Sequence, residues 1–150
     1  MFSKILLPVD FTGLAKEAID IAIDIGKKYN SKIFLLTVSE IGTVGYGELV
    51  LPEEIFEKHK ELIKENLEKI AKNFREKGLE VEIAVRDGIV YEEILEFAKE
   101  KKVGLIIMPT HGRKGITKFL LGSVSQKIVK LAHCPVLTFN PKYKEEFINE

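Results

Sequence analysis

The sequence has one cysteine, no tryptophan and no excess of charge of either sign. Because Cys134 is alone, no disulfide framework can form within the chain, as is usual for proteins of a reducing compartment. The 23 basic and 23 acidic residues are interleaved along the chain, which argues against a nucleic-acid partner. The first apolar run, from Ile5, ends at Pro8 and is too short for a signal peptide or a membrane span. These absences predict a cytoplasmic protein without a membrane partner.

Common metal and nucleotide motifs are also missing. His59, His111 and His133 lack the spacing of metal ligands, so no metal site is expected. There is no Gly-x-x-x-x-Gly-Lys-Ser/Thr phosphate loop, and no Gly-x-Gly-x-x-Gly pattern follows the first apolar run. With 45% hydrophobic and 31% charged residues over 150 positions, the chain is expected to form a single domain over residues 1–150.

Short apolar runs alternate with helical patterns along the whole chain. Continuous runs at 5–9, 33–38 and 105–108 are typical of parallel strands that are covered on both faces. In the run at 81–85, apolar and charged residues alternate, which predicts an edge strand with one face toward water. A last run at 135–139 completes five strands, with four amphipathic helices between them. The pattern predicts an α/β fold: a doubly wound, five-stranded parallel sheet of order 3-2-1-4-5 with helices on both faces.

Three glycines follow the strand at 105–108, with basic residues between them. Gly112, Gly115 and Gly122 allow backbone to approach a ligand closely, and a helix begins near Ser123 with free N–H groups in its first turn. In the predicted sheet this loop meets the loop after Val9 where the strand order reverses, so Asp10 is expected beside it. The segment therefore predicts a phosphate or nucleotide site.

A purely structural interpretation of the same residues stays open. Ser123 and Gln126 have the spacing of a capping box, in which both side chains satisfy backbone donors at a helix start. Asp10 could act as a helix N-terminal carboxylate before a helix at 14–29. Val38 and Met108 could be plain core, and His111 could form a structural hydrogen bond to backbone.

These residues resemble the universal stress protein family over nearly the whole chain. The resemblance rests on Pro8-Val-Asp10, on Val38, on His111-Gly112 followed after nine residues by Gly122-Ser123-Val124, and on Cys134-Pro-Val136. It implies a stress-response regulatory protein that binds ATP or a related adenine nucleotide, with Mg2+ arriving on the triphosphate. In one respect the chain departs from the pattern of ATP-binding members: Pro109, which has no N–H, stands where they have a glycine.

The resemblance also assigns roles to individual residues. Pro8, Val9 and Asp10 would lie at the nucleotide, with Asp10 near the ribose or adenine, and Val38 and Met108 would flank the base. The phosphates would be held by the residues of the glycine loop and the following helix start, which are Gly112, Gly122, Ser123 and Val124.

Assembly and activity are expectations of the same kind. A homodimer would form by antiparallel pairing of the edge strand at 135–139 across a twofold axis, and a further protein partner would read the nucleotide state. No side-chain acid and base pair stands out, so the chain is not expected to be an enzyme. Two alternatives remain, a slow ATP phosphohydrolase and a nucleotide-free dimeric scaffold.

Overall fold

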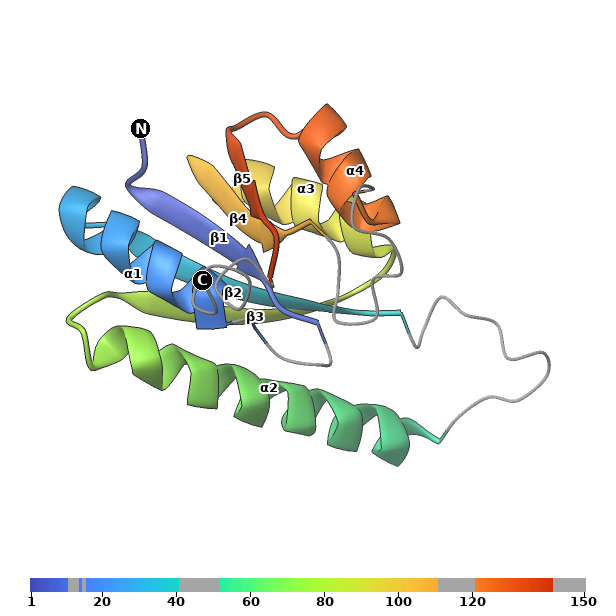
Figure 1. Ribbon diagram of the computed structural model, residues 1–150. Helices are drawn as coiled ribbons and strands as arrows, with labels where there is room; N and C mark the ends of the chain where they lie inside the picture. The colour runs from blue at the N-terminus through green and yellow to red at the C-terminus, as the bar shows by residue number, and fades with distance from the viewer. Residues whose placement is uncertain (11–13, 15, 41–51, 111–120, 142–150) are drawn as a thin grey trace, which may run out of the picture.

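A computed structural model describes residues 1–10, 14, 16–40, 52–110 and 121–141. Within these residues strands and helices alternate along the chain (Figure 1). The elements are β1 (Lys4–Pro8), α1 (Lys16–Tyr29), β2 (Lys32–Ser39), α2 (Glu53–Arg75), β3 (Val81–Asp87), α3 (Val90–Glu100), β4 (Leu105–Pro109), α4 (Ser123–Leu131) and β5 (Val136–Phe139).

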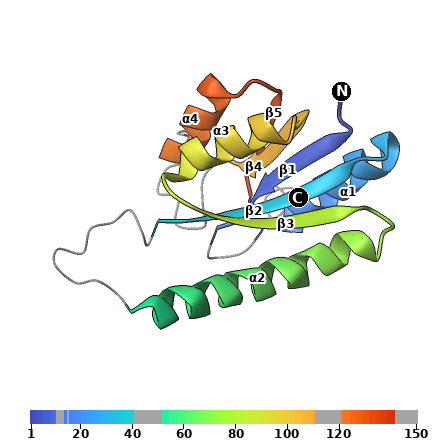
Figure 2. The same cartoon turned by 180° about the vertical axis from the view of Figure 1, so that it is seen from behind.

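The five strands form one parallel sheet in the order β3-β2-β1-β4-β5, which confirms the predicted topology. Helices α1 and α2 cover one face of the sheet, and α3 and α4 cover the other (Figures 1 and 2). From β1 the chain adds β2 and then β3 on one side, and then adds β4 and β5 on the other side of β1. That reversal places the switch point of the sheet between β1 and β4.

Alternate residues of the inner strands point into two separate cores. In β1, Ile5 and Leu7 pack in the layer of α1 and α2, whereas Leu6 packs in the layer of α3 and α4. All three side chains are fully buried. Burial on both faces explains why these strands are continuously apolar and do not alternate with polar residues.

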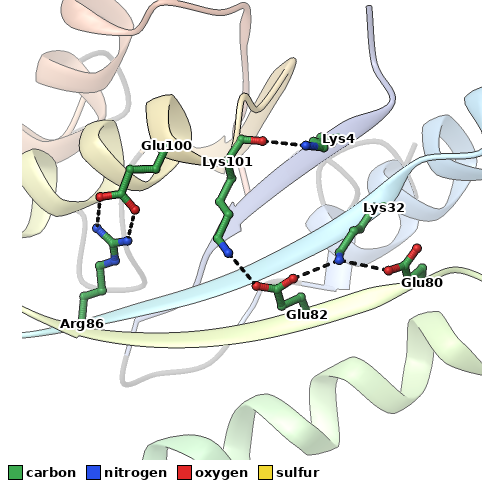
Figure 3. Close-up of polar contacts among 7 residues, drawn as sticks. All are labelled: Lys4, Lys32, Glu80, Glu82, Arg86, Glu100 and Lys101. Atoms are coloured by element: carbon green, nitrogen blue, oxygen red, sulfur yellow. Dashed lines mark hydrogen bonds and ion pairs between the residues drawn. The ribbon is translucent and has the colours of Figure 1, made fainter.

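Strand β3 is an edge strand, as predicted, but its charged face is partly covered. Glu82 forms ion pairs with Lys32 at 2.9 Å and with Lys101, at the end of α3, at 3.0 Å (Figure 3). Arg86 pairs with Glu100 of α3. This face thus meets water only in part, because ion pairs fasten the strand to α3 and to β2.

These ion pairs make the stability of the fold depend on pH. Hydrogen bonds from Lys32 and then Lys101 lower the pKa of Glu82 in the folded protein. A carboxylate with a lowered pKa stabilises the fold above its unfolded-state pKa, and that contribution is lost as the pH falls through the folded-state pKa. We expect Glu82→Gln to lower the free energy of unfolding at neutral pH by less than about 1 kcal/mol, because the pair is half exposed.

Denaturant titrations at neutral and at acidic pH would measure this effect. The difference between wild type and Glu82→Gln should shrink toward zero in acid, where the wild-type carboxylate is protonated. Glu61→Gln, on the exposed face of α2, is the matched control and should show a smaller change. A Glu82→Gln difference that is equally large at both pH values would contradict the assignment.

Candidate functional site

The carboxyl ends of β1 and β4 separate at the switch point. Pairing between these strands ends at Leu6 and Ile106, after which Pro8 pairs with β2 and Pro109 pairs with β5. In a parallel ladder the donors alternate between strands, so the next two N–H donors would be residues 8 and 109. Both are prolines and have no N–H to give. The pairing of β1 with β4 therefore ends before the carboxyl ends of the two strands. We call this break in pairing the gap; it lies at the end of the sheet where ligands of doubly wound sheets bind.

Asp10 lies at the end of β1, on the rim of this gap. The N–H of Val9 donates to the carbonyl oxygen of Leu36 at 2.8 Å, which keeps the chain beside β2. Val9 is buried and belongs to the core under α1 and α2, whereas Asp10 is exposed. Helix α1 begins at Lys16, later than predicted, so Asp10 lies outside its first turn. The interpretation of Asp10 as a helix N-terminal carboxylate depends on residues 11–13 and 15, which lie outside the described residues.

Val38 and Met108 lie near the ends of β2 and β4, on the α3 and α4 side of the sheet. Their exposed fractions are 6% and 5%, and both pack in the core with Phe34 and Ile106. The structure thus gives both side chains a core role. Little of either side chain is exposed for contact with an adenine base.

Helix α4 begins at the gap with an uncapped first turn. Gly122 is the N-cap residue, and as a glycine it has no side chain to form a cap hydrogen bond. The first helical hydrogen bond runs from the N–H of Gln126 to the carbonyl of Gly122, at 2.9 Å. The N–H groups of Ser123, Val124 and Ser125 consequently have no partner within the helix. Such groups, together with the positive end of the helix dipole, attract an anion.

The predicted capping box is absent. Ser123 is the first residue of the helix rather than its N-cap, so its side chain is in the wrong place to cap N–H groups further along. The helix nevertheless begins at Gly122 and Ser123, as the structural interpretation expected.

Two hydrogen bonds hold the start of α4 against the end of β4, which a third bond joins to β5. The N–H of Thr110 donates to the carbonyl of Phe139 at 2.9 Å, and the N–H of Gly122 donates to the carbonyl of Thr110 at 2.7 Å. The hydroxyl of Ser125 donates to the carbonyl of Pro109 at 3.0 Å. The first turn of α4 is thereby fixed beside the gap rather than tethered only through the preceding loop.

A pocket of about 250 Å3 opens on the other face of the sheet, between the ends of β1 and β2 and the first half of α2. Thr37, at its β2 wall, is 3% exposed, and the Nε2 atom of His59 is shielded from solvent. Its lining combines polar and aliphatic side chains: Asp10, Thr37, His59, Leu62, Ile63 and Asn66. Asp10 therefore borders both the gap and this pocket.

Comparison with known proteins identifies the family. The universal stress protein family matches residues 1–140. The chain belongs to this family. Universal stress protein MJ0531 of Methanocaldococcus jannaschii is 36% identical over 146 residues, which cover 97% of this chain and 86% of that protein. The structure of MJ0577 from the same organism superposes with a TM-score of 0.74 at 31% identity, over 93% of this chain and 96% of that one.

Two further universal stress protein structures share the fold and contain nucleotides. One, from Archaeoglobus fulgidus, is a complex with dAMP and matches with a TM-score of 0.64 at 20% identity, over 92% of this chain and 98% of that one. The other is a complex with cAMP and matches with a TM-score of 0.67 at 20% identity, over 93% of this chain and 98% of that one. At this identity the likeness concerns the fold alone.

The structure brings part of the predicted nucleotide site together. Pro8, Asp10 and the first turn of α4 lie around the gap, whereas Val9 is in the core. Gly112 and His111 lie outside the described residues. Within the described ranges no three His, Cys, Asp or Glu side chains gather as a metal site, and no helix is long and apolar enough to cross a membrane.

Sequence reasoning missed two features of the site. Ser125 was given no role, although its spacing from Ile128 places both on the buried side of α4. The pocket beside Asp10 was also missed, because His59 was weighed only as a metal ligand.

Burial raises the pKa of the half-buried Cys134 thiol, which disfavours the reactive thiolate.

Proposed function

We propose that this universal stress protein binds an adenine nucleotide at the gap between β1 and β4. The observation that carries the proposal is the uncapped first turn of α4, held by backbone hydrogen bonds at the point where the sheet opens. Free N–H groups at a helix start bind phosphate, and this end of a doubly wound sheet is where such ligands bind. The dAMP and cAMP complexes of related folds support an adenine nucleotide as the ligand.

The residues divide between the phosphate and nucleoside parts of the ligand. Ser123 and Val124 would donate backbone N–H groups to phosphate, and the exposed Ser123 side chain would add a hydroxyl donor. Asp10 would accept hydrogen bonds from the ribose or from the adenine amino group. With ATP, Mg2+ would be held mainly by the phosphates, as is usual for this ion.

The bound nucleotide would act as a regulatory ligand rather than as a substrate. Backbone N–H groups can stabilise phosphate charge but cannot accept the proton of an attacking water. Hydrolysis of ATP is therefore expected to be no faster than a slow leak. The regulatory form would be a dimer paired through β5, and a second protein would recognise its nucleotide state.

Two measurements test this proposal. Mass spectrometry of the denatured purified protein should release an adenine nucleotide, and calorimetry on the emptied protein should show binding of ATP or AMP. GTP is the control, and it should bind more weakly, because it presents a carbonyl where adenine presents an amino group. If no adenine nucleotide binds at about millimolar concentration, which is about −4 kcal/mol, the proposal fails and the scaffold alternative is favoured.

A further inference from the structure

A buried hydroxyl lies in the first turn of α4, beneath the N–H groups that the proposed phosphate would contact. Ser125 is 4% exposed, and its Oγ donates a hydrogen bond to the carbonyl oxygen of Pro109 at 3.0 Å. Ile128, one turn further along α4, is fully buried in the core of the same face. The Ser125 side chain therefore points toward the sheet and not toward the ligand.

The gap explains why the Pro109 carbonyl takes its partner from a helix. Odd-numbered residues of β4 face β1, because Ile106 and Thr110 donate to β5. In a continued ladder a residue of β1 beyond Pro8 would donate to the Pro109 carbonyl. The register of β1 with β4 ends at Leu6 and Ile106, before this position. The Ser125 hydroxyl of α4 donates to the Pro109 carbonyl instead.

We propose that Ser125 is a positioning residue for phosphate binding, an inference that rests on the proposed function. The break in pairing between β1 and β4 would make room for a nucleotide. At the same break, the Pro109 carbonyl accepts the hydrogen bond that fastens α4 to the sheet. The Ser125 hydrogen bond fixes the rotation and the height of the first turn above the gap. The N–H groups of Ser123 and Val124 are thus held in place before the ligand arrives, which reduces the ordering that binding requires.

Binding of AMP and of adenosine to three proteins would test this role. Ser125→Ala removes the hydroxyl, and Ser125→Thr keeps a hydroxyl at the same place. We expect Ser125→Ala to weaken AMP binding about tenfold and adenosine binding by less than about twofold, since adenosine has no phosphate for α4 to hold. Ser125→Thr should retain most of the AMP affinity. Equal weakening for both ligands, or no weakening for AMP, would overturn the proposal.

Amide hydrogen exchange of the ligand-free proteins gives a second measurement. Ser125→Ala should speed exchange at Gln126, whose N–H donates to Gly122, and at Gly122, whose N–H donates to Thr110, while exchange in α3 stays unchanged. Unchanged exchange at the start of α4 would overturn the positioning role even if binding changed. If the wild type binds neither AMP nor adenosine, the proposed function fails. If the wild type binds AMP and Ser125→Ala binds it equally well, only the positioning role fails.

Discussion

Replacing Gly122 with valine should reduce the binding of ATP and AMP by more than about a hundredfold, or about 2.7 kcal/mol. Gly122 has φ −58° and ψ 158°, a conformation that any residue adopts. The position therefore does not need glycine for backbone freedom. What glycine offers is space beside the first N–H groups of α4, and a branched side chain there would keep phosphate at a distance. Valine is a poorer N-cap than glycine, so stability should fall by no more than about 1 kcal/mol.

Calorimetry with ATP on folded variants would measure the effect. Ser123→Ala should cost about 1.5–3 kcal/mol in binding, because it removes one hydrogen bond to a charged acceptor. Val129→Ala, on the exposed side of α4, is the matched control and should bind as the wild type does. Binding of ATP to Gly122→Val at wild-type affinity would show that the phosphates do not lie at α4.

The fold could be predicted from the sequence because composition differs sharply between inner and edge strands. Runs such as 33–36 are apolar at every position, as burial on both faces requires. The charges of β3, at Glu82 and Arg86, distinguish an edge strand from an inner one. The ion pairs of those charges with α3 could not be predicted, because they depend on where the end of α3 comes to lie.

The site was less predictable because it depends on backbone hydrogen bonds between distant segments. The sequence presents Pro109 as the loss of one donor from a glycine pattern. Only the strand register shows that an N–H at position 109 would have pointed at β1. Pro8, on β1, also has no N–H to donate across this break. The prediction of a capping box at Ser123 was wrong for a related reason. The bond between Gly122 and Thr110 fixes where the helix starts, and local spacing carries no information about it.

The two edges of the sheet differ in how well they are protected against pairing with another strand. Strand β3 carries charged residues along its length, and such charges prevent unwanted pairing. Strand β5 has the sequence Val-Leu-Thr-Phe, with no charge. Among the described strands it pairs only with β4. We therefore infer that, of the two edges, β5 is the one that joins two copies of the chain across a twofold axis.

Alternate residues of β5 point toward β4 and toward the open edge. The carbonyls of Pro135 and Phe139 accept hydrogen bonds from Ile106 and Thr110 of β4. Since residues alternate along a strand, Leu137 also faces β4, whereas Val136 and Thr138 present their backbone groups at the open edge. Thr138→Pro would remove an outward N–H and leave the pairing with β4 in place, as proline is tolerated where the N–H of an edge strand faces outward.

We expect Thr138→Pro to convert the dimer into a folded monomer, measured by light scattering and circular dichroism over a range of concentrations. Leu137→Pro is the matched control, because it removes an N–H that faces β4 and should destabilise the fold itself. The proposed pairing requires the wild type to be dimeric and the two prolines to have different effects. A wild type that is monomeric at high concentration would contradict it. So would a Thr138→Pro variant that remains a dimer, because the outward N–H of β5 would then have no part in the interface.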